Sequence, residues 1–395
     1  MKIPNAKASA SFAIALSATV ISSTAFVAAS SASSLTEGVP QYDHQIVIMM
    51  ENHGYDEIIG SPNTPYINQL ANTYNTETNF FSTTHPSLPN YLTLISGSTF
   101  GNGAPFNPIQ ADPSLGNDNP PCISAGHFAG PTTAIPSGAS QNCDATINSP
   151  SIVDQLATQS LTWKTYQENL PADKLAANSN TAGVNDKLYA VKHDPFLYFN
   201  TVQNDPNQLK NVVGFDQLGA DLTSGALPNF SFIAPNQCND MHGDPNGGCP
   251  YGVTDPADAN EKAILKAGDN EVKSLVSAIT SSSAWSQGNN VIYLTWDEND
   301  YGTGTNQVPL IAITNNGYQG VRDGAYGNTC SLLRTIEDGF GINSYLGCAG
   351  NAPVLSSLVT PVPNPSTEIG IASASILFGV NLLSKKRKAK LNKSL

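Results

Sequence analysis

Basic residues are scarce along most of this 395-residue chain. Two of the 18 Lys and Arg residues lie within residues 1–32 and six within residues 369–395, whereas Glu368 is the one acidic residue of 31 outside residues 33–367. Residues 33–367 therefore carry ten basic side chains against thirty acidic ones, a net charge of about −20. Binding of nucleic acid needs clustered Lys and Arg, so we expect no nucleic-acid partner. Any anionic ligand, phosphate included, would need a local source of positive charge such as a metal ion.

The six cysteines include no Cys-x-x-Cys pair, which argues against a structural zinc cluster. They form three groups that are close in sequence: Cys122 with Cys143, Cys238 with Cys249, and Cys330 with Cys348. An even number of cysteines in an exported chain indicates disulfides, although six cysteines allow many connectivities and the sequence does not select one.

The N-terminus has the order of a secretory signal peptide. Lys2 and Lys7 precede an Ala- and Ser-rich apolar run over residues 11–27, and small residues follow it, with cleavage expected after Ala29 or Ala32. We therefore expect residues 1–32 to direct export, which places the protein in the periplasm, at the cell surface or outside the cell.

The C-terminus combines a Pro-rich stretch, residues 361–366, with an apolar run over residues 369–383 and a basic tail from Lys385 onward. The apolar run is shorter than a relaxed membrane helix, which needs roughly 17 to 25 residues. This order resembles the PEP-CTERM sorting segments of bacterial envelope proteins, although Asn364 stands where those usually have Glu. We expect a linker and sorting motif at 356–368 and, at 369–395, an apolar segment with a basic cytoplasmic tail that could attach the protein to the membrane or envelope.

Between these ends, apolar runs of strand length recur. They lie at residues 45–50, 231–234, 291–296 and 309–314. Continuous rather than alternating apolar runs are typical of strands that are buried on both faces of a mostly parallel sheet.

Helical patterns separate these runs. One helix is expected to begin at Thr64-Pro65, another to cover about 260–279, and a third to cover about 331–340 before Gly341. A segment rich in Gly, Pro, Asn and Ser, residues 99–148, indicates a long surface excursion. Alternating strands and helices favour an α/β fold, a three-layer αβα sandwich with a mostly parallel central sheet.

Two of the predicted strands end on acidic and amide side chains, Glu51-Asn52 and Asp297-Glu298. Functional groups gather at the carboxyl ends of strands in open α/β sheets. Asp and Asn also begin many loops for turn chemistry alone, so either pair by itself would favour a structural interpretation. Together they predict a site at one edge of the sheet.

A third element, residues 83–97, places Ser87 where a helix should begin, with Pro89 in its first turn and Gly97 at its end. Ser is a common helix cap that needs no catalytic explanation. A hydroxyl at a helix N-terminus also lies at the positive end of the macrodipole, where an alkoxide and an anion are both favoured. Ser87 is therefore a candidate nucleophile if the acidic pairs converge on it.

Seven stretches carry a family resemblance: ENHGYD, HPSLPNYLTLISG, TWKTYQENLP, KHDPFLYF, NDMHGD, LTWDEND and SLLRTIEDGFG. Taken in order, they resemble the successive blocks of the phosphoesterase family that contains bacterial acid phosphatases and phosphatidylcholine-type phospholipases C, within the alkaline phosphatase superfamily. The resemblance extends from His44 to Gly350. It implies an alkaline phosphatase-like fold and a phosphoesterase catalytic domain over residues 33–355.

The resemblance also implies one divalent metal ion, held by Glu51, Asn52, Ser87, Asp297 and Glu298. Oxygen ligands of this kind suit a hard cation, with Ca²⁺ favoured over Mg²⁺ or Zn²⁺. Ser87 would be both ligand and nucleophile, and would attack a phosphoric ester in line to give a phosphoserine that water then hydrolyses. His53, although next to this site, is expected to have no role in it.

Two further residues match active-site positions of the family, His193 and His242, which would bind phosphate oxygens or protonate the leaving group. His85 either takes part or only flanks the site. Asp240 is either a further ligand or a residue that orients His242. Lys192 either supplies positive charge or is simply solvated.

These features predict an exported, acid phosphatase-like phosphomonoesterase that acts on a small phosphate ester. One alternative is a phospholipase C-type phosphodiesterase, because the same site could cleave a diester, although Ser rather than Thr as nucleophile favours the monoesterase. Another is a catalytically inactive, envelope-anchored binding protein. It is suggested by the C-terminal tail and by Thr329-Cys330, where the family often has His-Tyr.

Overall fold

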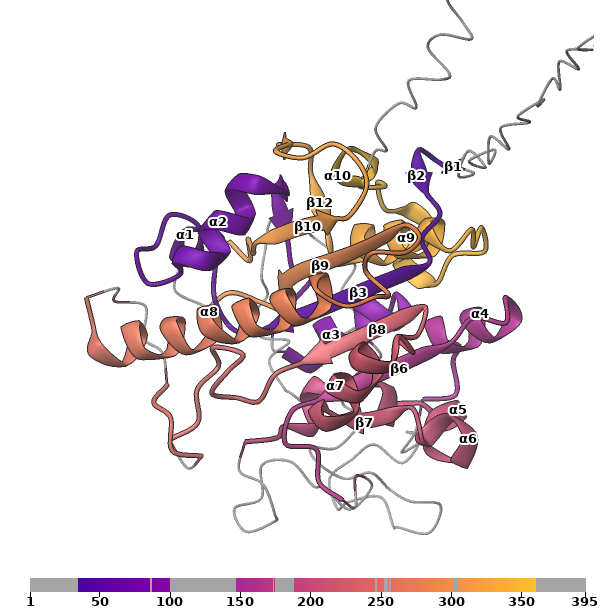
Figure 1. Ribbon diagram of the computed structural model, residues 1–395, viewed down its shortest axis with the longest axis horizontal. Helices are drawn as coiled ribbons and strands as arrows, with labels where there is room; N and C mark the ends of the chain where they lie inside the picture. Colours follow the sequence, from indigo (N-terminus) through magenta and orange to yellow (C-terminus); the bar gives the residue numbers. More distant parts are fainter. Residues whose placement is uncertain are drawn as a thin grey trace, which may run out of the picture. The chain divides into compact units, whose positions relative to one another are not determined.

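The structure is a computed structural model that describes residues 35–85, 87–99, 147–172, 174, 188–245, 247–251, 255, 257–300 and 305–359 (Figure 1). Several predictions lie outside the described residues: the signal peptide, the Cys122 and Cys143 pair, almost all of the surface excursion at 99–148, and the sorting motif with the apolar and basic segments after it. They stay predictions.

An eight-stranded sheet lies at the centre of the described fold (Figure 1), in the order β11-β4-β10-β9-β3-β8-β6-β7. Its strands are β3 (His44–Met50), β4 (Asn75–Glu77), β6 (Trp163–Gln167), β7 (Val212–Gly214), β8 (Phe230–Ala234), β9 (Asn290–Trp296), β10 (Leu310–Thr314) and β11 (Arg322–Asp323). Strand β10 is antiparallel to both of its neighbours, and the other pairs in this sheet are parallel. The mostly parallel sheet is therefore confirmed, and each predicted strand forms within one residue of its expected start.

Two short two-stranded sheets flank it. One pairs β1 (Leu35–Thr36) with β2 (Val39–Pro40), and the other pairs β5 (Phe80–Phe81) with β12 (Gly327–Asn328). The central strands β8, β9 and β10 are buried along their whole length, and β3 is buried from its second residue onward. This burial on both faces explains their continuous apolar sequences.

Helices cover both faces of the sheet. Figure 1 shows α8 (Ala259–Thr280) in front of the central strands and α3 (Ser87–Ser96) behind them. In front, α2 (Pro65–Thr73) contacts α8, and behind, α3 contacts α9 (Thr329–Gly339) and α4 (Ile152–Thr158). The three-layer αβα sandwich and the three predicted helices are therefore confirmed.

The remaining described helices are short, apart from α7 (Phe215–Ser224). They are α1 (Tyr55–Ile58), α5 (Asn200–Gln203), α6 (Pro206–Leu209), α10 (Ser356–Val359) and the 3₁₀ turns η2 (Val191–His193), η3 (Pro195–Tyr198) and η4 (Gly347–Asn351). Helix α10 corrects the predicted start of the linker at residue 356, because Leu358 and Val359 are buried in the core. None of the described helices combines the length and the apolar character that crossing a membrane requires.

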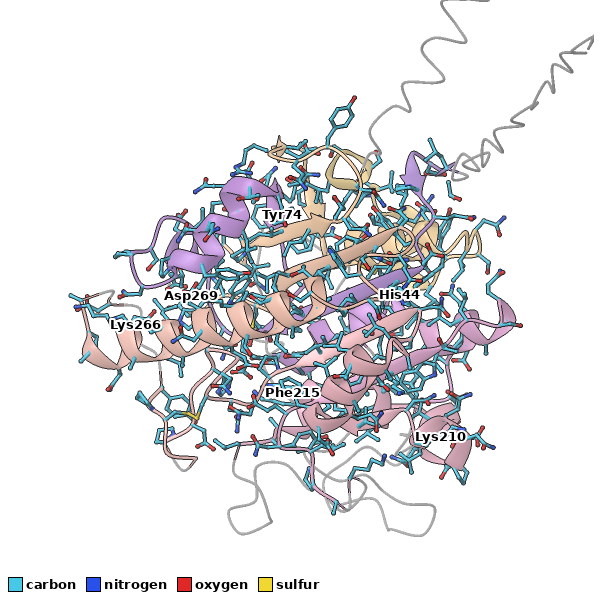
Figure 2. All side chains as sticks on the ribbon, in the orientation of Figure 1. His44, Tyr74, Lys210, Phe215, Lys266 and Asp269 are labelled. Carbon is cyan, nitrogen blue, oxygen red and sulfur yellow. A yellow bond between two sulfur atoms is a disulfide. The ribbon has the colours of Figure 1, made fainter. Side chains whose placement is uncertain are left out.

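A buried carboxylate joins two of the helices in front of the sheet. Asp269 of α8, labelled in Figure 2, accepts hydrogen bonds from the backbone N–H groups of Tyr66 and Ile67 at 3.1 and 2.8 Å. These N–H groups belong to the first turn of α2, where a negative charge also meets the positive end of the helix dipole.

Two of the cysteine pairs form disulfides, Cys238–Cys249 and Cys330–Cys348. The second ties the first turn of α9 to η4, and the backbone N–H of Cys348 donates to the carbonyl of Gly97 at 2.9 Å. The C-terminal end of α3 is thereby fixed.

Gly97 is the tightest point of this contact and gives a stability prediction. Its φ is +70°, and a Cβ placed there would lie 2.2 Å from the carbonyl oxygen of Leu346. Gly60, with a φ of +91° and open space around it, is a matched control. We expect Gly60→Ala to lower the free energy of unfolding by about 1–2 kcal/mol through backbone strain. Gly97→Ala should lower it by a further ~1–3 kcal/mol because the clash is with backbone. Urea unfolding measures both, and equal losses would contradict the close approach.

Candidate active site

The two acidic pairs meet because β3 and β9 are parallel neighbours in register. Met50 pairs with Trp296, so both strands end at the same level and Glu51 and Asp297 follow side by side. The backbone N–H of Asp297 donates to the carbonyl of Met50 at 3.0 Å, and that of Asn52 donates to Asp297 Oδ1 at 3.2 Å. Strand pairing thus fixes where these side chains begin.

Ser87, the first residue of α3, joins this cluster. Its Oγ lies 3.1 Å from Glu51 Oε2 and 3.2 Å from Glu298 Oε1, and the side chain is buried. A hydroxyl has one hydrogen to donate, so it can satisfy only one of the two carboxylates at a time. The structure therefore brings the predicted nucleophile between the two acidic pairs.

The amide of Asn52 completes a ring of oxygens. Its inward atom lies 3.1 Å from Glu298 Oε1 and 3.2 Å from Glu51 Oε2. In the present orientation this atom is the amide oxygen, and it faces only carboxylate oxygens. Rotating the amide by 180° would put its NH₂ group there, which could donate to both carboxylates. The backbone of Asn52 is left-handed, with φ of +49°, a conformation that Asn tolerates better than most residues.

This ring fits a hard cation. Oxygens at right angles around Ca²⁺ or Mg²⁺, at roughly 2.0 to 2.6 Å from the ion, lie roughly 2.9 to 3.7 Å apart. Asp297 Oδ2 is buried without a hydrogen-bond partner at the same place. In the described part of the chain, no three His, Cys, Asp or Glu side chains stand in metal-binding geometry by themselves. The candidate set is instead mixed, with carboxylates, an amide and a hydroxyl.

Like charge is crowded in this pocket. Burial, with a smaller contribution from the charge of Glu298, raises the pKa of Glu51 to about 8, although Lys192 and the hydroxyl of Tyr91 act to lower it. Burial and the charges of Glu51 and Glu298 hold the pKa of Asp297 well above its ordinary value. The site is therefore short of positive charge, which a bound cation would supply.

Lys192 is the nearest positive charge to Ser87. It is 7% exposed, and its Nζ lies 3.4 Å from Ser87 Oγ and 3.4 Å from His242 Nε2. Of the two interpretations of Lys192, solvation is therefore wrong. His242 Nδ1 lies 2.7 Å from the carbonyl of Gly243, so Nδ1 carries the hydrogen and Nε2 faces Lys192.

His193 is held between two carboxylates. Its Nε2 lies 3.0 Å from Glu51 Oε1 and its Nδ1 lies 3.2 Å from Asp240 Oδ2. The ring stacks on Tyr91 with a centroid distance of 5.3 Å and an interplanar angle of 4°. Burial, with the charges of Lys192 and His242, keeps its pKa well below the ordinary value. Both nitrogens are thus turned toward carboxylates.

Asp240 acts on the loop that carries His242. Its Oδ1 accepts the backbone N–H of His242 at 2.7 Å, and its own carbonyl accepts the N–H of Glu51 at 2.8 Å. Met241 between them is buried with φ of +85°, a rare conformation for a bulky residue. Between the two interpretations of Asp240, the contacts favour orientation of His242.

The other two histidines near the site differ in their contacts. His85 Nδ1 lies 2.6 Å from Glu298 Oε2, and this contact restrains the carboxylate of Glu298. His53 Nδ1 lies 3.1 Å from the backbone carbonyl of Glu51 and its Nε2 lies 3.1 Å from Glu261 Oε1 on α8. His53 therefore links the end of β3 to α8.

Sequence reasoning missed two residues of α3, Asn90 and Tyr91. The Asn90 Oδ1 accepts from Thr83 Oγ1 at 2.8 Å and from the N–H of Thr84 at 3.0 Å, and its Nδ2 donates to the Thr84 carbonyl at 2.8 Å. The same carbonyl accepts from Asn306 Nδ2 at 2.7 Å, on the segment that follows β9. The signal available in the sequence was an Asn among the mostly apolar residues of this helix.

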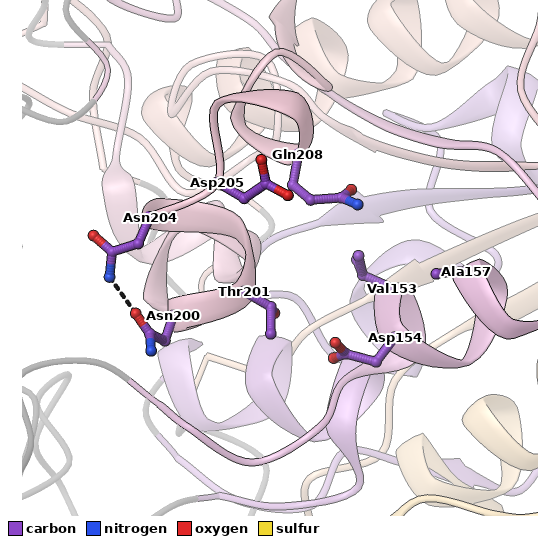
Figure 3. A pocket seen from close by; sticks show the side chains of 8 residues that line it. All are labelled: Val153, Asp154, Ala157, Asn200, Thr201, Asn204, Asp205 and Gln208. Atoms are coloured by element: carbon purple, nitrogen blue, oxygen red, sulfur yellow. Dashed lines mark hydrogen bonds between the residues drawn. The ribbon is translucent and has the colours of Figure 1, made fainter.

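An open groove lies away from these residues, between α4 and the α5–α6 region (Figure 3). It has a volume of about 390 Å³ and is lined by Val153, Asp154, Ala157, Asn200, Thr201, Asn204, Asp205 and Gln208. Its two carboxylates are occupied as helix caps, Asp154 with Ser151 and Asp205 with Asn207. The groove contains none of the predicted site residues.

Asn90 gives a prediction for the framework of the site. Asn90→Ala leaves the N–H of Thr84 and the hydroxyl of Thr83 without the acceptor that Asn90 supplies, and it removes one of two amide donors to the Thr84 carbonyl. We therefore expect the free energy of unfolding to fall by about 1–3 kcal/mol. Asn207→Ala, at an exposed position, is the control and should change it by no more than about 0.5 kcal/mol. Chemical denaturation measures both variants. Equal effects would mean that Asn90 does not anchor the segment before Ser87.

The sequence of this chain is similar to those of a known protein family. Residues 61–343 match the phosphoesterase family. The phosphatidylinositol-3-phosphatase of Mycobacterium tuberculosis is 29% identical over 327 residues, which cover 81% of this chain and 84% of that protein. The acid phosphatase of Aspergillus fumigatus is 28% identical over 209 residues, which cover 52% of this chain and 38% of that protein. A probable acid phosphatase of Kluyveromyces lactis is 29% identical over 197 residues, 50% of this chain and 38% of that protein, so this chain matches well under half of either fungal relative.

Solved structures are also similar. A protein in the alkaline phosphatase superfamily from Vibrio parahaemolyticus has a TM-score of 0.46 and 14% identity, and the match covers 82% of this chain and 76% of that one. The lipoteichoic acid synthase LtaP from Listeria monocytogenes has a TM-score of 0.49 and 9% identity, with coverage of 84% and 80%. The family match over residues 61–343 spans most of the chain and includes Ser87, Asp297 and Glu298. The chain therefore belongs to the phosphoesterase family and is an enzyme that hydrolyses phosphoric esters.

Proposed function

We propose that this protein is a metal-dependent, exported phosphomonoesterase that acts through a phosphoserine at Ser87. The observation that carries the proposal is the position of Ser87 Oγ, at the start of α3, within 3.2 Å of two carboxylates and 3.4 Å from the Lys192 ammonium. The relatives that are named phosphatases support a monoester as substrate.

Glu51, Asn52, Asp297 and Glu298, with Ser87, would hold the metal ion. A bound Ca²⁺ or Mg²⁺ would supply positive charge that favours the ionised form of Ser87 and offsets the repulsion between carboxylates and phosphate. The donor set consists of oxygens, which suits these ions better than zinc.

The residues of the chain divide the chemistry between them. The Ser87 oxygen attacks phosphorus, so an O–P bond forms as the ester P–O bond breaks and the alcohol departs with a proton. Water then attacks the phosphoserine, which releases phosphate and returns the hydrogen to Ser87. The dipole of α3 and the Lys192 ammonium both favour the negative charge that develops at Ser87 Oγ.

His242 is the better placed of the two predicted histidines to serve the leaving group. Its Nε2 contacts Lys192 rather than a carboxylate, and the residue is only partly buried. His193 has both nitrogens against carboxylates, which suits it to hold Glu51 in place. We therefore assign proton transfer to the leaving oxygen to His242, whose Nε2 would first take a proton from the Lys192 ammonium while that amine takes the hydrogen of Ser87. We assign a positioning role to His193.

Two disulfides, Cys238–Cys249 and Cys330–Cys348, support export, because such bonds persist in oxidising compartments. They agree with the signal peptide predicted at residues 1–32. The predicted C-terminal segment would then hold the enzyme at the envelope.

The nucleophile can be tested directly. Ser87→Ala should lower phosphate release from a simple aryl phosphate by roughly 10³-fold or more, since no neighbouring side chain can take the place of the attacking hydroxyl. Ser224→Ala, an exposed serine on α7, should leave activity unchanged. Activity of Ser87→Ala close to the wild type would refute the mechanism. The same preparations should be assayed with phosphatidylcholine, because cleavage of that diester alone would favour the phospholipase C alternative.

The metal site predicts that one variant will lose affinity for the metal without losing stability. Asp297→Asn removes one of the crowded negative charges, while an Asn oxygen can still accept from the Asn52 N–H. We expect this variant to resist unfolding at least as well as the wild type in chelator, yet to bind Ca²⁺ or Mg²⁺ at least about tenfold more weakly. Calorimetric titration and thermal unfolding measure the two effects, with Asp216→Asn at an exposed position as control. Unchanged affinity in Asp297→Asn would exclude it as a ligand.

A further inference from the structure

Tyr251 is an exposed aromatic side chain beside the active site. With 52% of its surface exposed, it is one of three large hydrophobic residues that are exposed in the described part of the chain, together with Leu35 and Tyr318. Its ring lies 5.8 Å from that of His242, at an angle of 58°. Single exposed hydrophobic residues are common on protein surfaces, so the contact with His242, and not the exposure alone, singles out Tyr251.

Tyr251 is the outermost member of a row of contacts that begins at the nucleophile. Ser87 Oγ lies 3.4 Å from Lys192 Nζ, this atom lies 3.4 Å from His242 Nε2, and the His242 ring meets Tyr251. Exposure increases along the row from 1% at Ser87 and 7% at Lys192 to 52% at Tyr251. In an in-line attack, the leaving group lies on the side of phosphorus away from Ser87. A leaving group that extends along this row toward solvent passes His242 and then reaches Tyr251.

Although exposed, Tyr251 is held in place by its backbone. The disulfide Cys238–Cys249 closes the loop that carries His242, and Tyr251 follows it by two residues. Gly243, with φ of +82°, packs so closely that a Cβ there would lie 2.1 Å from the Pro250 carbonyl oxygen and 2.7 Å from the Tyr251 Cα. The N–H of Cys249 also donates to the Asp244 carbonyl at 3.1 Å. The backbone that carries the ring is therefore restrained relative to His242, which reduces the entropy lost when a ligand binds.

We propose that Tyr251 determines leaving-group specificity, by stacking against the flat face of a ring in the alcohol portion of the substrate. This inference rests on the proposed phosphomonoesterase function. The shared chemistry is a ring face next to the ester oxygen, which an aromatic ring or the C–H face of a sugar-type ring both offer. Phosphate esters of short acyclic alcohols lack such a face. They would use the site around Ser87 without contacting Tyr251.

Steady-state kinetics on three substrates tests this assignment. We expect Tyr251→Ala to lower kcat/KM about three- to tenfold for phenyl phosphate, for glucose 6-phosphate or for both, mainly through KM. The value for glycerol phosphate should change by less than about twofold. Tyr251→Phe should keep the wild-type values, because the ring face is retained. Tyr318→Ala removes an equally exposed tyrosine elsewhere and should have no effect.

The possible outcomes separate this inference from the function on which it rests. A loss confined to one ring substrate would support the inference and identify which kind of ring is preferred. Equal losses on all three substrates, or no loss on any, would overturn it while leaving the phosphomonoesterase intact. If the wild-type protein released phosphate from none of the three esters, the proposed function itself would fail.

Discussion

Crowding of like charge at the ends of β3 and β9 is the constraint on which the rest of the site depends. Glu51, Asp297 and Glu298 are almost fully buried, and each raises the cost of ionising the others. A cluster of this kind would loosen unless its side chains were held individually. The neighbours do so: His193 and His85 contact the carboxylates of Glu51 and Glu298, and the backbone of Asn52 donates to Asp297. The result is a set of oxygen atoms held close together against their own repulsion, ready for a positive charge.

The origin of this arrangement lies in the topology of the sheet. Because β3 and β9 are parallel and adjacent, two segments far apart in the sequence end at one level, and their first loop residues become neighbours. Helix α3 lies behind the sheet (Figure 1) and begins at Ser87, whose Oγ contacts the carboxylates of Glu51 and Glu298. Its position depends on Asn90, which fixes the segment before the helix, and on Gly97, where the other end of the helix meets the Cys330–Cys348 region. The position of Ser87, the proposed nucleophile, thus depends on packing at both ends of α3.

The parts of the structure that could be predicted are those in which the order of apolar and polar residues directly reflects burial or the end of a strand. Continuous apolar runs gave β3, β8, β9 and β10 almost to the residue, and both acidic pairs follow strands that lie together. The direction of β10 was not predictable, because burial on both faces looks the same in parallel and antiparallel strands. Nor was the burial of Lys192, since a long basic side chain gives no local signal of the carboxylates that it will meet. The linker was expected to begin too early because four residues of α10 are too few to show a helical period.

The two sides of the site stand on different kinds of structural element, and this fits the proposal that the enzyme binds every phosphate group in the same way but selects among alcohols. The carboxylates, Asn52 and Ser87 stand on strand ends and on a buried helix, where neighbouring elements restrict every backbone position. His242 and Tyr251 stand instead on a loop whose shape comes from a disulfide and from the close approach of Gly243 to Pro250. A change in that loop alters the surface that a leaving group meets without disturbing the register of β3 and β9. Chemistry at phosphorus and choice of leaving group can therefore vary separately in this fold, because different physical interactions hold them.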